Sequence, residues 1–139
     1  MVCTFFGHKD TPKEIEPTLR TTLINLIEQE NAREFYVGNN GKFDAMVRRQ
    51  LEDLSKAYEI NFTVVLAYLP EDRRKHDNLV NTIYPEGIES VPKRFAISWR
   101  NNWMLKQSDY VVTYITHSWG GAAQYADKAN HLKKTIINV

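Results

Sequence analysis

The sequence predicts an α/β fold, a Rossmann-like three-layer sandwich around a five-stranded parallel sheet. Short apolar runs alternate along the 139 residues with segments in which apolar residues recur at helical spacing. The runs are continuously apolar, which is typical of strands that helices cover on both faces. Glycine and small polar residues follow three of them, as at the carboxyl ends of parallel strands. Because crossovers between parallel strands are right-handed, the expected strand order is 3-2-1-4-5.

The first half of the chain is expected to hold three strands and two helices. Apolar, β-favouring runs predict strands at residues 2–6, 35–37 and 62–69. Between them, leucine, isoleucine and valine recur at helical spacing. This predicts a first helix over about residues 17–30 and a second helix whose apolar face runs through residues 47–58.

The second half is expected to begin with a long loop. In residues 70–92 the apolar residues follow neither the helical nor the strand period, and the segment contains three prolines. A loop of this length in a compact domain is usually functional or mobile. Aromatic residues between positions 95 and 103 then recur at helical spacing, which predicts a helix with this stripe in the core or at a dimer interface. A fourth strand is expected at residues 110–115, a last helix after the glycine pair 120–121, and a fifth strand at residues 135–139.

The composition is that of an ordinary globular protein, and residues 1–139 fit a single domain. The formal net charge of +1 gives no electrostatic argument for binding nucleic acid or an anionic membrane, so neither is expected as a partner. Cys3 is the only cysteine, which excludes a disulfide within the chain and favours a reducing compartment. No apolar run is long enough to span a bilayer, and the N-terminus lacks a signal-peptide pattern, so the expected location is the cytoplasm.

The stretch VGNNGKFDAMVRR, residues 37–49, favours an anion-binding loop. Gly38 and Gly41 allow a tight turn whose N–H groups point toward one place, and the following helix adds the positive end of its dipole. This combination binds phosphate without needing net positive charge. Asp44 is expected either to accept hydrogen bonds from ribose hydroxyls or to cap its helix. Ordinary turns use the same residue types, so this loop alone does not identify a site.

A second glycine pair, Gly120 and Gly121, repeats this pattern before the last expected helix. The expected strand order places the switch point between the first and fourth strands, where ligands bind beyond the carboxyl ends. Two such loops meeting there favour a ligand site. The residues expected to contribute are Gly7, His8, Lys9, Gly38, Asn39, Asn40, Gly41, Phe43, Asp44, His117, Ser118, Trp119, Gly120 and Gly121.

Two kinds of side chain in these loops have specific expected roles. His8 and His117 end adjacent strands and can donate to a phosphate, whereas the four histidines show no metal-ligand spacing, so no metal site is expected. Trp119 either stacks on a base or packs against a neighbouring loop.

Four segments together resemble the SLOG superfamily, which includes the Lonely Guy cytokinin-activating enzymes, the DprA/Smf proteins and the YpsA-like proteins. They are FFGHKD, GNNGKFD, RNNWMLKQSDYVVTY and SWGGAAQYAD, and the resemblance covers nearly the whole chain. It is strongest for a small stand-alone YpsA-like member, whose first strand likewise ends in a Gly-His-basic triplet. The resemblance implies a Rossmann-like fold, frequent homodimers or higher homo-oligomers, and a pocket for nucleotides or molecules derived from them.

The Lonely Guy enzymes suggest roles for two further residues. Arg100, Met104 and Asp109 reproduce the spacing of an arginine, a methionine and an aspartate in those enzymes, which makes Arg100 a candidate clamp for phosphate or ribose. Only the glycine pair 120–121 matches their Gly-Gly-x-Gly-Thr-x-x-Glu motif, and Asp127 stands where the catalytic glutamate would be.

The resemblance therefore implies a protein that binds a nucleotide-derived small molecule, such as an ADP-ribose, NAD-type or nucleoside phosphate ligand, as a sensor or sequestering protein. No cofactor is expected. One alternative is a Lonely Guy-like nucleoside 5'-monophosphate phosphoribohydrolase with Asp127 as its catalytic acid. Another is a regulatory module that acts by contacting other proteins.

Overall fold

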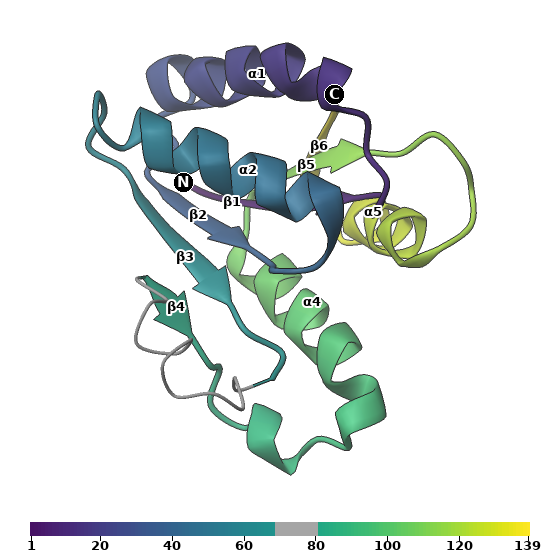
Figure 1. Cartoon of the computed structure of the whole chain (residues 1–139). Helices are drawn as coiled ribbons and strands as arrows, with labels where there is room; N and C mark the ends of the chain where they lie inside the picture. Colours follow the sequence, from purple (N-terminus) through teal and green to yellow (C-terminus); the bar gives the residue numbers. More distant parts are fainter. Residues whose placement is uncertain (69–80) are drawn as a thin grey trace.

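The computed structural model describes residues 1–68 and 81–139, which form a three-layer α/β arrangement (Figure 1). In the described residues a single sheet holds six strands in the order β4-β3-β2-β1-β5-β6, and every neighbouring pair is parallel. The strands are β1 (Val2–Gly7), β2 (Glu34–Val37), β3 (Asn61–Val65), β4 (Thr82–Ile83), β5 (Tyr110–Tyr114) and β6 (Thr135–Asn138).

Helices cover both faces of this sheet, as the continuous apolar strands predicted (Figure 1). Successive residues of β1 point to opposite faces: Phe5 packs in the cluster that α1 and α2 complete, and Phe6 packs in the cluster that α4 and α5 complete. The helices are α1 (Glu16–Gln29), α2 (Gly41–Leu54), α4 (Ala96–Gln107) and α5 (Gly121–His131), with short 3₁₀ turns η1 (Lys13–Ile15), η2 (Ile88–Ser90) and η3 (Lys93–Phe95).

The predicted sheet of five strands is wrong, because β4 adds an edge strand beside β3. β4 is only two residues long and lies in the segment expected to be a loop, so it shows no period in the sequence. The five expected strands lie in the order β3-β2-β1-β5-β6. Residues 69–80, which include the last residue of the expected third strand and the start of the expected long loop, lie outside the described part of the chain.

The expected aromatic stripe does not form one surface. Trp103 packs against Tyr36 of β2 in an edge-to-face contact, with 5.1 Å between ring centroids, and so belongs to the core. Trp99 is half-buried, and its ring lies 3.6 Å from where a Cβ on Gly87 would be. Phe95 precedes the first turn of α4 and is 50% exposed. The aromatic stripe was expected to lie either in the core or at a dimer interface. Core packing therefore explains part of it.

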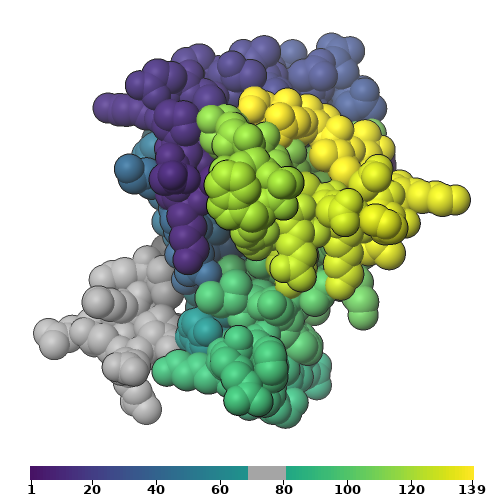
Figure 2. Space-filling view, turned by 90° about the vertical axis from the view of Figure 1, so that its right-hand side faces the viewer, coloured from purple at the N-terminus to yellow at the C-terminus, as the bar shows by residue number. Residues whose placement is uncertain are grey.

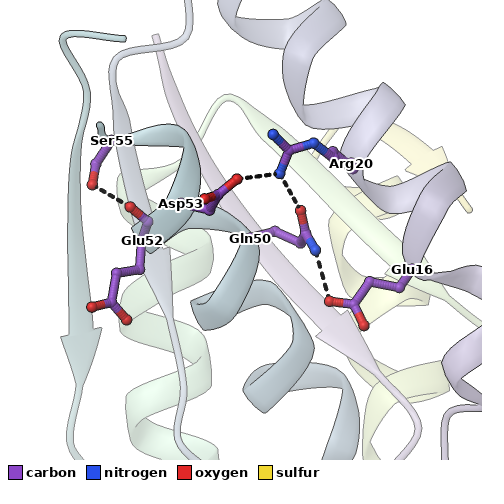
Figure 3. A network of polar contacts seen from close by, with 6 residues as sticks. All are labelled: Glu16, Arg20, Gln50, Glu52, Asp53 and Ser55. Atoms are coloured by element: carbon purple, nitrogen blue, oxygen red, sulfur yellow. Dashed lines mark hydrogen bonds and ion pairs between the residues drawn. The ribbon is translucent and has the colours of Figure 1, made fainter. Parts of the chain in front are cut away.

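A chain of polar side chains joins α1 to α2 on the outside of the molecule (Figure 3). Arg20 Nη1 donates to Gln50 Oε1 at 2.8 Å and pairs with Asp53 Oδ2 at 2.7 Å. Gln50 Nε2 in turn donates to Glu16 Oε2 at 2.7 Å, and this hydrogen bond is the main reason that the pKa of Glu16 lies below its ordinary value. These contacts join the two helices at the surface, away from the apolar residues that they bury.

No helix within residues 1–68 and 81–139 is long and apolar enough to cross a membrane.

Candidate functional site

A cleft of about 470 Å³ opens at the carboxyl ends of β1 and β5. This is the point where the chain order reverses in the sheet, and ligands of open parallel sheets bind at such a point. Ten of the expected site residues line it, namely Gly7, His8, Lys9, Asn40, Asp44, Arg100, His117, Trp119, Gly120 and Gly121.

Two loops far apart in the sequence form one wall of the cleft. Figure 2 shows the purple segment after β1 directly beside the green segment that follows β5. A hydrogen bond joins them, since the Thr116 backbone N–H donates to His8 Nε2 at 2.9 Å. A ring nitrogen that accepts a hydrogen bond is unprotonated, and burial is the main cause that lowers the pKa of His8. His8 therefore serves this wall as a neutral ring.

Three rings stack in a column along this wall. The His8 and His117 rings lie 3.7 Å apart between centroids with 17° between their planes. The His117 and Trp119 rings lie 3.8 Å apart with 18° between their planes. His8 is buried at one end of the column, and Trp119 is exposed at the other.

Arg100 is the only arginine that lines the cleft among the described residues, and it is only 2% exposed. Its Nε donates to Asn101 Oδ1 at 3.0 Å, and its Nη1 donates to Asn39 Oδ1 at 3.1 Å and to the Val65 carbonyl at 3.2 Å. No hydrogen bond of Nη2 is found in the described part of the chain, and no fully buried side-chain nitrogen there lacks a partner. Among the described residues Nη2 is therefore not fully buried, and the guanidinium that carries it is fixed in place beside the cleft.

Asp44 is the acidic neighbour of this arginine. Its Oδ2 accepts the Asn40 backbone N–H at 3.0 Å, and Asn40 is the N-cap of α2, so Asp44 lies inside the first turn and the expectation that it is the N-cap is wrong. Burial raises the pKa of Asp44 to about 6, against the opposing effects of the Asn40 hydrogen bond and of the Arg100 charge.

Two N–H groups of the first glycine loop and the helix start that follows it donate within the chain. The Asn40 N–H goes to Asp44, and the Lys42 N–H donates to the Lys9 carbonyl at 2.9 Å. Gly41 has a φ of +86°, and a Cβ there would lie 2.9 Å from the Lys9 Cα. These two N–H groups therefore hold a carboxylate and a carbonyl of the chain itself, and phosphate binding by this loop stays a prediction.

Gly38 and Phe43 lie behind the cleft. A Cβ on Gly38 would lie 2.7 Å from Asp44 Oδ2 and 3.1 Å from Arg100 Cζ, so the glycine leaves room for these two charged groups. Phe43 is buried, and a Cβ on Gly7 would lie 2.2 Å from its ring. These residues shape the site from behind, together with Asn39, which hydrogen-bonds Arg100.

The second glycine loop is open. Gly121 begins α5, lines the cleft, and has no atom within 4 Å of where a Cβ would be. The first N–H of this helix to bond back along it is that of Gln124, which reaches the Gly120 carbonyl at 3.1 Å. The N–H groups of residues 121–123 therefore have no partner within the helix, which leaves a positive helix end at the cleft.

Asp127 and Ser118 are not brought together with Arg100. Both line a separate depression, which shares with the cleft only Gly120. The Asp127 side chain is 74% exposed, and its Oδ2 lies 3.8 Å from His131 Nδ1. No group of side chains in the described part of the chain is arranged to hold a metal ion.

Six lining residues were not expected, namely Phe5, Phe6, Asp10, Ile97, Asn101 and Ala122. Two of them could have been expected from the sequence, because Ile97 lies one helical turn before Arg100 and Asn101 follows Arg100 directly. Asp10 directly continues the expected triplet that ends at Lys9.

The comparisons with known proteins show the fold alone. The sequence matches no protein-family model and no curated protein. A solved structure, DNA processing protein A (DprA) from Streptococcus pneumoniae, is similar with a TM-score of 0.71 at 12% sequence identity. The similarity covers 98% of this chain and 49% of that one, so this chain spans about half the length of DprA. The Rossmann-like arrangement is thus shared with a protein of the superfamily that the sequence resembles.

Proposed function

We propose that this protein binds a nucleotide-derived small molecule in the cleft between β1 and β5, as a sensor or sequestering protein. The observation that carries the proposal is Arg100, which lines the cleft and whose guanidinium is buried and fixed by three hydrogen bonds. A fixed guanidinium nitrogen suits the oxygens of phosphate and ribose. The proposed relatives are the SLOG proteins, and a YpsA-like member is the narrower proposal.

The open end of α5 supports the same ligand chemistry. Gly120, Gly121 and Ala122 line the cleft with Arg100, and the first N–H groups of α5 have no partner within the helix. A helix N-terminus and an arginine together hold an anion locally, which a chain with a net charge of +1 requires.

Binding without hydrolysis fits the position of Asp127. A catalytic acid for cleaving a glycosidic bond has to lie within hydrogen-bond reach of its target. Asp127 lines a different depression from Arg100, so the arrangement gives no support to the hydrolase alternative.

Calorimetry of the purified protein with AMP, ADP-ribose and NAD tests the proposal. We expect at least one of these ligands to bind. We expect Arg100→Lys to weaken that binding about tenfold or more, because the lysine ammonium does not replace the guanidinium nitrogen Nη2. Gly121→Val adds bulk where the structure has open space beside the cleft, so it should weaken binding while the protein stays folded. Asp127→Asn is the matched control and should bind as the wild type does.

Two outcomes would contradict the proposal. A well-folded protein that binds none of these ligands would favour the module that contacts other proteins. Repeated release of free base from a nucleoside monophosphate, abolished in Asp127→Asn, would establish the hydrolase.

A further inference from the structure

The three-ring column ends in an aromatic face that the chain itself leaves open. One face of the Trp119 indole stacks on His117, yet the residue is 70% exposed. Single exposed apolar side chains are common on protein surfaces, so exposure alone identifies nothing. Trp119 differs from such side chains because its ring plane is fixed.

Stacking on His117 orients this plane, and the His117 ring is itself held from its other side. His117 Nδ1 donates to the Trp119 carbonyl at 2.8 Å, and the His117 ring stacks on both Trp119 and His8. His8 is in turn held by the Thr116 N–H on its Nε2. A side chain that is already ordered loses little conformational freedom on binding, so the open indole face is pre-organised to receive another flat ring.

The same cleft joins this apolar face to the anion-binding donors. Trp119 and Ile97 are large exposed hydrophobic side chains, and both line the cleft with Arg100 and the start of α5. A cleft that offers both an aromatic plane and fixed donors for phosphate matches the two chemical ends of a nucleotide.

We propose that Trp119 is the base-stacking platform of the cleft, so that the ligand is a nucleotide which keeps its planar nucleobase. A purine is favoured, because its two fused rings cover more of the indole than a pyrimidine does. This inference rests on the proposed function, since it places the base of the ligand whose phosphate or ribose Arg100 contacts.

The test compares a ligand that has a base with one that lacks it. AMP or ADP-ribose, whichever binds the wild type more tightly, is compared with ribose 5-phosphate by calorimetry and by indole fluorescence. Trp119→Leu keeps an apolar side chain but removes the ring. It should lower the affinity for the base-bearing ligand about tenfold and change the affinity for ribose 5-phosphate less than about twofold. Trp119→Tyr restores a ring and should recover most of the affinity. Phe95→Leu removes an exposed aromatic ring that does not line the cleft and should change neither ligand.

Fluorescence gives an independent readout. Stacking should quench the wild-type indole emission with AMP and not with ribose 5-phosphate, and the quenching should disappear in Trp119→Leu. An unchanged AMP affinity in Trp119→Leu, or an equal loss of both ligands, would overturn the stacking role while leaving phosphate binding at Arg100 standing. If the folded wild type binds no ligand of the panel, the proposed function fails, and the stacking role fails with it.

Discussion

The Asp44 carboxyl makes the stability of the native state depend on pH. Its pKa rises from an ordinary 3.8 to about 6 in the folded protein because the group is buried. Between these two values the native state holds a proton that the unfolded chain has released. The free energy of unfolding therefore falls as the pH rises through this window, and above it the native state carries the full cost of a buried carboxylate.

Asp44→Asn should remove this dependence, because the amide does not titrate and its carbonyl oxygen can still accept the Asn40 N–H. Between pH 4 and pH 7 we expect the free energy of unfolding of the wild type to fall by on the order of 2 kcal/mol relative to that of this variant. Urea unfolding of both proteins across that range measures the effect, and taking the difference cancels the other titrating groups. A difference that stays constant with pH would show that burial does not govern this carboxyl.

Gly7 should tolerate no side chain. A Cβ there would lie 2.2 Å from the ring of the buried Phe43, so Gly7→Ala forces the start of α2 away from β1. Overpacking of this kind costs about 1–3 kcal/mol or more, which thermal or urea unfolding would detect. Gly121→Ala is the control and should keep wild-type stability, since nothing lies within 4 Å of its Cβ position. Equal stability of the two variants would mean that the contact with Phe43 is not tight.

The sequence was informative about the residue types of the site and less so about their partners. Glycine and asparagine in the first loop correctly indicated a tight turn before a helix, but their N–H groups could not be assigned to Asp44 and Lys9 without the tertiary contacts. The same holds for Gly38, whose function is to leave room between two charged side chains. Periodicity gives no measure of such close approaches.

At the scale of elements, the contacts between α1 and α2 should contribute little stability. Arg20 and Asp53 are both substantially exposed, so solvent screens their charges. We expect Arg20→Ala to lower the free energy of unfolding by less than about 1 kcal/mol. Leu23→Ala on the buried side of α1 is the comparison and should cost about 2–5 kcal/mol. Urea unfolding distinguishes the two, and a larger loss for Arg20→Ala would show that the polar network carries more of the interface than the buried leucines do.

Elements were predicted well wherever they were long enough to show a period. Within residues 1–68 and 81–139, the five longer strands and the four α-helices follow from apolar runs and helical spacing, with ends shifted by a few residues. The helix that begins at Glu16 even tolerates Pro17, because a proline in the first turn gives up no helical hydrogen bond. The two-residue β4 was missed, because its pairing with β3 is a tertiary contact with no signature of its own.

At the scale of the whole molecule, a homodimer or higher homo-oligomer remains a prediction that the resemblance supports. The aromatic stripe contributes less than expected, because Trp103 is used in the core. Exposed large hydrophobic side chains do surround the start of α4, where Phe95 and Ile97 are exposed and the Tyr68 hydroxyl bonds the Lys93 carbonyl. Sedimentation across a range of concentrations should therefore give a species heavier than 16.2 kDa. A clean monomer throughout would contradict this prediction.

The central position of β1 imposes an order on how the chain can fold during synthesis. β1 pairs with β2 early in the chain and with β5 more than a hundred residues later, and the Val2 N–H reaches the side chain of Asp109. While the ribosome is still making α4 and α5, the sheet face that carries Phe6 and Val65 has no cover. Pairings this distant in sequence are slow to form, so the nascent first half is exposed to aggregation and to chaperones. The cleft is lined both by residues at the end of β1 and by residues after β5. A ligand can therefore bind only late in folding, after these distant segments have come together.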